Sequence, residues 1–148
     1  MKKLIAILLP VCLLLSGCGK QAADSTQASA KVDSAAVSEI DLTQMSGTMV
    51  YSYVYNIVTT PQEYEGQCFR IQGTSDASYW DETDTTYHYI VIADATACCA
   101  QGLEFILSDG HAQYPEAGAN IEIRGVLEPY MEEDRLYYHI VADEIRVL

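Results

Sequence analysis

Adjacent cysteines are the strongest chemical signal in this sequence. Cys98 and Cys99 lie between two β-rich runs in the segment IADATACCAQGLEF, and Cys68 opens an earlier run. Thiols can bind soft metal ions, form disulfides or undergo redox chemistry. Neighbouring residues on a regular strand point to opposite faces, so adjacent cysteines can share an ion only within a turn.

Structural and metal-binding roles for these thiols both stay open. A bridge from Cys68 to Cys98 or Cys99 would close a loop of about 30 residues and contribute roughly 3 kcal/mol to stability. A metal ion held by the adjacent pair could complete its shell with Cys68, His88 or His111. This ion is the only cofactor that the sequence suggests.

Redox chemistry is a third role for the pair. A vicinal disulfide between Cys98 and Cys99 could switch the conformation of a turn. The nearby charges oppose this role, because Asp94 and Glu104 would raise the pKa of a thiol and reduce its thiolate fraction. We therefore expect the pair to secure a tight turn, and reduced cysteines to pack as small apolar residues.

Two acidic, aromatic segments could form a ligand site. They are SYWDETDTTYH and EPYMEEDRLYY. Carboxylates beside aromatic rings suit a cation, an amine-bearing ligand or a sugar stacked on a ring. The alternative is that these segments are hairpin tips whose charge serves solubility. The candidate ligand-binding residues are Trp80, Asp81, Glu82, Asp84, Tyr130, Glu132, Glu133 and Asp134.

Catalytic motifs are missing from the sequence. Nucleophile-elbow, zinc-protease, P-loop and dinucleotide-binding patterns do not occur. His88 and His139 each lie beside tyrosines within β-rich runs, where we expect ordinary strand residues. The sequence therefore favours a binding or interaction module over an enzyme, with a metal-binding or thiol-redox protein as the alternative.

The elements that position these residues begin at Gly47, where the composition changes. All eleven tyrosines and the single tryptophan lie beyond it. Residues 48–58 fit both a helical stripe and a strand, and we expect a short helix that ends before Pro61. Five β-rich runs follow, over residues 68–80, 86–95, 102–108, 120–130 and 135–148.

Five strands in about 100 residues predict one small, mainly β core. The long first strand with Gly73 at its middle, and the Pro- and Gly-containing entry to the fourth strand, are typical of the five-stranded OB-fold. The usual helix between the third and fourth strands does not fit in DGHAQYPEAGA. We expect an OB-like barrel over residues 47–148 with one short N-terminal helix.

The barrel region also resembles a family of small bacterial lipoproteins with an OB-fold-like domain. The segments PQEYEGQCFRIQG and IADATACCAQGLEF carry the resemblance, which covers about residues 48–148. It implies the fold and a lipid anchor, and the family brings no assigned chemistry. In an OB-like barrel the two acidic segments would join strands one to two and four to five, at one side of the barrel.

The first residues match a lipoprotein signal peptide. Lys2 and Lys3 precede an apolar run over residues 4–15, which is shorter than the roughly 20 residues needed to span a bilayer. The sequence LSGC, ending at Cys18, resembles a bacterial lipobox, in which the cysteine is diacylated and becomes the mature N-terminus. An ordinary signal peptide with a chance cysteine is the alternative. We expect removal of residues 1–17 and anchoring of Cys18 to the extracytoplasmic face of the bacterial cell membrane.

Residues 18–46 are expected to form a flexible linker. They are rich in Ala, Ser, Gln and Asp and contain no aromatic residue, so they bury little apolar surface. The whole chain has a formal charge of −13, which repels phosphate backbones and argues against a nucleic-acid partner. Beside the membrane, the expected partner is a cationic, amine-bearing or sugar ligand, or an envelope protein.

Overall fold

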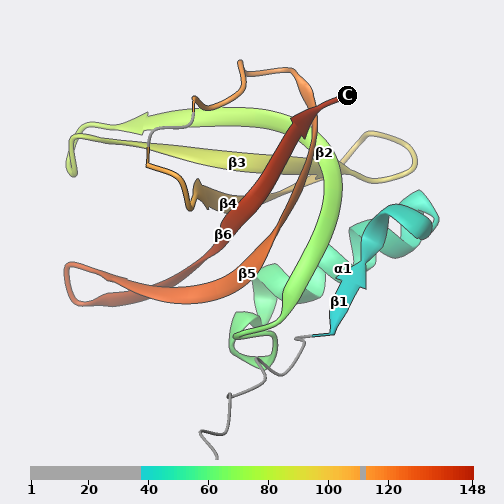
Figure 1. Ribbon diagram of the computed structural model, residues 1–148, viewed down its shortest axis with the longest axis horizontal. Coiled ribbons are helices and arrows are strands. Elements are labelled where there is room, and N and C mark those ends of the chain that lie inside the picture. The colour runs from blue at the N-terminus through green and yellow to red at the C-terminus, as the bar shows by residue number, and fades with distance from the viewer. Residues whose placement is uncertain (1–37, 111–112) are drawn as a thin grey trace, which may run out of the picture. The chain divides into compact units, whose positions relative to one another are not determined.

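The computed structural model describes residues 38–110 and 113–148 (Figure 1). The expected signal peptide, the expected lipidation site Cys18 and most of the expected linker lie outside these residues, as does His111. The elements are β1 (Glu39–Asp41), η1 (Leu42–Gln44), α1 (Gly47–Thr59), η2 (Pro61–Glu63), β2 (Cys68–Trp80), β3 (Thr85–Ala93), β4 (Ala100–Leu107), β5 (Asn120–Glu132) and β6 (Arg135–Val147).

The five long strands form one small barrel. Antiparallel pairs join β2 to β3, β3 to β4, β5 to β6 and β2 to β5, and a parallel pair joins β4 to β6. The pairings therefore return to β2, in the strand order of an OB-fold. The β4–β6 pairing is the shortest of this ring, with three residue pairs, so the barrel is partly open. The prediction of a mainly β, OB-like barrel is confirmed.

Alternating side chains build the core, as the strand predictions required. Ile121 and Ile123 on β5, and Leu103 and Phe105 on β4, point inward and are almost completely buried. All five predicted strands are present, and their ends lie within two residues of the predicted ones. Burial of these apolar side chains is the main favourable contribution to folding.

The predicted helix is also confirmed, as α1. Val54 and Ile57 are fully buried in the core, and the helix packs against β4 and β3. It ends where Thr60 donates its backbone N–H to the Asn56 carbonyl, because Pro61 follows and disfavours further helix. The described residues between β4 and β5 contain no helix. No helix in residues 38–110 or 113–148 is long and apolar enough to cross a membrane.

The expected linker is corrected at its C-terminal end, because residues 38–46 belong to the folded domain. β1 pairs in parallel with the first three residues of β2, and Leu42 is fully buried in the core. β2 pairs with β3 only from Thr74 onward, which leaves the edge of its first residues open. β1 covers that edge and satisfies its backbone groups.

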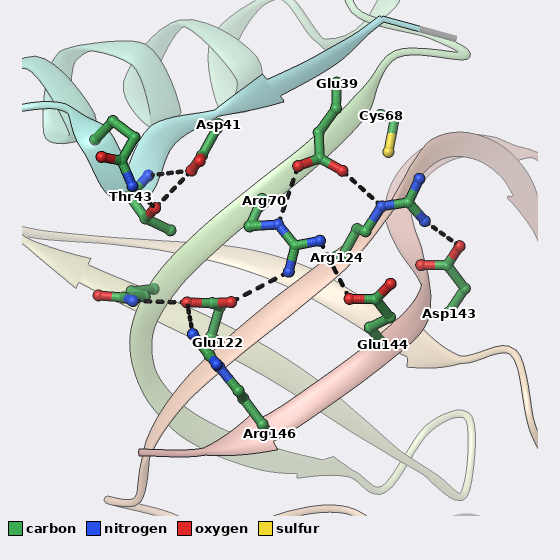
Figure 2. A network of polar contacts seen from close by, with 12 residues as sticks. Glu39, Asp41, Thr43, Cys68, Arg70, Glu122, Arg124, Asp143, Glu144 and Arg146 are labelled. Atoms are coloured by element: carbon green, nitrogen blue, oxygen red, sulfur yellow. Dashed lines mark hydrogen bonds and ion pairs between the residues drawn. The ribbon is translucent and has the colours of Figure 1, made fainter. Parts of the chain in front are cut away.

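A network of ion pairs fastens β1 to the barrel (Figure 2). The carboxylate of Glu39 accepts hydrogen bonds from Arg70 Nε at 3.0 Å and from Arg124 Nε at 2.6 Å. Arg124 also pairs with Asp143, and Arg70 donates to Glu144 at 3.1 Å. Four different strands therefore meet in one charged cluster.

Glu122 is the buried acid of this network, with only 4% of its surface exposed. It accepts hydrogen bonds from Gln72 at 2.6 Å, from Arg146 at 2.8 Å and from Arg70 at 3.2 Å. These donors, Gln72 and Arg146 first, lower the pKa of Glu122 to about 2. Three hydrogen-bond donors therefore keep the Glu122 carboxylate ionised in the folded state.

Candidate functional site

Residues from both predicted loops line one cleft. Its volume is about 730 Å³, and its walls include Trp80 and Glu82 from the β2–β3 hairpin, with Tyr130, Glu132 and Glu133 from the β5–β6 hairpin. The tips of these two hairpins lie on the same side of the barrel (Figure 1). The strand order brings together two segments that are about 50 residues apart in the chain, as the OB-like topology implies.

The other three predicted loop residues lie outside the cleft lining. Asp84 accepts a hydrogen bond from the Tyr79 hydroxyl at 2.7 Å, across the hairpin tip. Its φ of 51° lies in the left-handed region that tight turns use. Asp81 and Asp134 are exposed at the two tips and do not line the cleft.

Glu104 on β4 lines the cleft and was not among the predicted site residues. It accepts a hydrogen bond from the Tyr130 hydroxyl at 2.8 Å and lies 3.6 Å from Nδ1 of His139. The rings of Tyr130 and His139 stack with their centroids 4.5 Å apart. Burial, with the hydrogen bond to Glu104, raises the pKa of Tyr130, so its hydroxyl stays protonated as a donor.

Tyr87 and Glu132 form a second tyrosine–carboxylate pair in the cleft. The Tyr87 hydroxyl donates to Glu132 and lies 3.0 Å from Oγ1 of Thr83. The hydrogen bond to Glu132 raises the pKa of Tyr87. The cleft therefore holds two carboxylates, on β4 and β5, each oriented by a tyrosine hydroxyl from another strand.

The charge of the cleft is strongly acidic. Its lining contains four glutamates and one basic side chain, Arg135. Aromatic rings make up much of the remaining wall. Carboxylates beside aromatic faces attract cations, and the same field repels phosphate and carboxylate ligands. The aromatic lining residues are Trp80, Tyr87, Tyr89, Tyr130, Tyr137 and Tyr138.

The pair Cys98 and Cys99 lies outside the cleft, in the turn between β3 and β4. The Asp94 N–H donates to the Cys99 carbonyl at 2.9 Å, and the Ala97 N–H donates to the Asp94 carbonyl at 3.0 Å. Oδ1 of Asp94 accepts from the backbone N–H of Cys98 at 3.0 Å and from that of Thr96 at 3.2 Å. Backbone and Asp94 contacts close this turn, and neither cysteine is in a disulfide.

The side chains of the turn converge as well. Sγ of Cys98 lies 3.3 Å from Oδ2 of Asp94 and 3.7 Å from Sγ of Cys99. Partial burial opposes ionisation of Asp94, but the donors from Cys98 and Thr96 outweigh it and lower the pKa of Asp94. The hydrogen bond to Cys98 raises the pKa of Cys99.

Cys68 and His88 do not join this group. Cys68 is a free thiol buried at the start of β2, near Glu39 in Figure 2, and burial raises its pKa. Cys98 and Cys99 are free and exposed, so the structure contains no bridge between Cys68 and the turn. His88 stacks on Tyr114 at a centroid distance of 3.5 Å.

Comparison with known proteins yields only remote structural likenesses. No family model matches the chain, and no curated protein matches it. Among solved structures, the chain is similar to the dimeric N-terminal domain of PriB protein from Thermoanaerobacter tencongensis, with 16% sequence identity and a TM-score of 0.38. That match covers 55% of this chain and 94% of the other. Such a likeness supports no functional argument, and the fold assignment rests on the strand pairing itself.

Proposed function

We propose that this protein is a lipid-anchored binding module whose OB-like barrel captures organic cations in the cleft between its two long hairpins. The observation that carries the proposal is the pairing of Glu104 with Tyr130 and of Glu132 with Tyr87. Each pair places an oriented carboxylate in an aromatic-walled cleft of about 730 Å³.

The chemistry of an organic cation matches both features of this lining. An ammonium group gains about 0.5–2 kcal/mol over the face of an aromatic ring, and more beside a carboxylate that it can reach. Because tyrosine hydroxyls already orient Glu104 and Glu132, less side-chain freedom is lost when a cation binds. A quaternary ammonium or a polyamine therefore fits better than a neutral ligand.

Anchoring at Cys18 is the second part of the proposal. It is supported by the short apolar run, the LSGC sequence and the resemblance to small bacterial lipoproteins. Two acyl chains give stable attachment to a bilayer, whereas one gives only reversible binding. An anchored module would meet its ligand at the cell surface.

Fluorescence of Trp80 tests the binding function directly. Trp80 is the only tryptophan in the chain and lines the cleft, so its emission reports on occupancy. The full chain in detergent is titrated with choline and with spermidine at low ionic strength. We expect a saturable change, and a Kd raised at least about fivefold by Glu104→Gln or Glu132→Gln.

Glu116→Gln is the matched control, because Glu116 is an exposed acid that does not line the cleft. Its Kd should equal that of the unmodified chain. The proposal fails if neither cation changes the emission, or if all three variants bind equally well. Saturable binding of a neutral oligosaccharide without binding of either cation would favour the stacked-sugar alternative.

A further inference from the structure

The turn between β3 and β4 holds chemistry that the cleft does not use. Among residues 38–110 and 113–148, Asp94, Cys98 and Cys99 form a group whose potential ligand atoms all lie within 4.8 Å of one another. None of the three lines the cleft. The geometry points to a binding site for a soft divalent metal ion, with zinc as the best match, held by two thiolates and one carboxylate.

The distances between donor atoms match a tetrahedral zinc site. With Zn–S bonds of about 2.3 Å, two sulfur ligands are separated by about 3.8 Å, and a sulfur and a carboxylate oxygen by about 3.5 Å. The observed separations are 3.7 Å between the sulfurs of Cys98 and Cys99, and 3.3 Å between Cys98 Sγ and Asp94 Oδ2. These two edges of the tetrahedron are therefore formed before any ion binds.

The local backbone explains how adjacent cysteines come to share one side. Neighbouring side chains diverge on a regular strand, but Cys98 and Cys99 precede β4 and lie in a turn. Ala97, directly before the pair, adopts a φ of 54°, in the left-handed region that regular strands do not use. The turn thus removes the obstacle that the sequence alone presents to shared ligation.

The backbone of the turn holds Asp94 in place through one of its two carboxylate oxygens. Oδ1 accepts from the backbone N–H groups of Cys98 and Thr96, which fixes the orientation of the carboxylate. Oδ2 accepts only side-chain hydrogen bonds, from Cys98 Sγ at 3.3 Å and from the Thr96 hydroxyl at 3.1 Å, and an ion would replace the first of these when the Cys98 thiol loses its proton. Backbone donors of this kind orient a metal ligand in the way that outer hydrogen bonds do in known sites.

Binding of a zinc ion would release the thiol protons of Cys98 and Cys99. One Zn²⁺ would displace the two thiol protons to solvent, form two Zn–S bonds and one Zn–O bond, and leave the site with a net charge of −1. Both cysteines are exposed, so water can supply the fourth ligand. Because thiol protons must leave, zinc affinity should increase as the pH rises from 6 to 8.

The test measures zinc uptake by the full chain. The protein is purified in detergent, kept reduced with a phosphine, freed of chelator and mixed with zinc for native mass spectrometry. We expect about one zinc per chain, and a Kd raised at least about tenfold by Cys98→Ser, Cys99→Ser or Asp94→Asn. Cobalt provides a second readout, since a thiolate-to-cobalt charge-transfer band should appear and should weaken with each cysteine substitution.

Cys68→Ser is the matched control, because Cys68 is a buried thiol outside the turn. It should keep the zinc and the cobalt band unchanged, and so should Glu104→Gln in the cleft. Stoichiometric uptake that survives both turn cysteine substitutions would assign the ion to surface carboxylates and overturn the proposal. Absence of stoichiometric zinc in the reduced chain would overturn it as well.

Discussion

Arg70 on β2 and Arg124 on β5 are paired directly across the two strands, and Glu39 accepts a hydrogen bond from Nε of each. Like charges in direct cross-strand positions destabilise a sheet. Glu39 supplies the counter-charge from β1, outside the five-stranded barrel. The short strand that precedes α1 therefore has an electrostatic role in the barrel as well as covering the edge of β2.

Glu39→Gln should lower the free energy of unfolding by about 1–2 kcal/mol, because two partly buried ion pairs are lost and the repulsion between Arg70 and Arg124 is no longer compensated. Urea denaturation at low salt measures the loss, which should shrink in 1 M NaCl as the charges are screened. Glu144→Gln is the control, since Glu144 is 59% exposed and makes a single contact with Arg70 in this network. Equal losses for the two variants would refute the bridging role of Glu39.

Glu122 should make stability depend on acid pH. Its folded-state pKa of about 2 lies below the ordinary value of 4.5. The folded state therefore binds its proton less readily than the unfolded state, and Glu122 stabilises the fold fully above about pH 4.5. This contribution should be lost progressively as the pH falls from about 4.5 towards 2.

Glu122→Gln isolates this effect from that of the other acids. The variant should be less stable than the unmodified chain at pH 7, and the difference between them should narrow between pH 4.5 and 2. Denaturation curves at several pH values in that range provide the measurement. Parallel stability profiles across the range would show that Glu122 is not the responsible acid.

Gly125 is required by the close approach of β6. It lies at an irregularity in the β5–β6 register, and an added Cβ would collide with the Val141 carbonyl oxygen and lie 2.7 Å from Ala142 Cα. Gly125→Ala should destabilise the barrel by about 3 kcal/mol, since the backbone of β6 must move. In Gly102→Ala the new methyl would lie 3.7 Å from the Tyr89 ring, an ordinary contact, so stability should not fall. Thermal denaturation of both variants tests the contrast, and similar melting temperatures would contradict it.

The strands and α1 could be predicted because their apolar side chains repeat with a clear period and turn residues separate them. β1 could not, because three residues carry no measurable period and their pairing depends on an edge of β2 left open by the barrel. The placement of the two acidic hairpins at one side of the barrel could be predicted, because it follows from the strand order of an OB-like barrel. Which of their residues line the cleft depends on turn conformation, such as the left-handed φ of Asp84.

Two features of the candidate sites could not be predicted from the local sequence. Glu104 and His139 are 35 residues apart and meet because β4 pairs in parallel with β6, a non-local contact. Asp94 was expected to disfavour thiolate formation through its charge. The structure shows that it is also a hydrogen-bond acceptor for Cys98 and a third potential metal ligand. Only the turn conformation brings these three groups together.

Lipid attachment at Cys18 should be visible in the intact mass of the protein expressed in a bacterium that processes lipoproteins. The unmodified chain should lack residues 1–17 and carry acyl groups at its new N-terminus, because the resemblance of LSGC to a lipobox predicts both acylation of Cys18 and removal of the signal peptide. Cys18→Ser should lose the acyl mass. Cys12→Ser is the control: residue 12 leaves with the signal peptide, so its mature mass should equal that of the unmodified protein. A mature mass altered by Cys12→Ser would show that the leader is retained, and an acylated Cys18→Ser protein would place the lipid elsewhere.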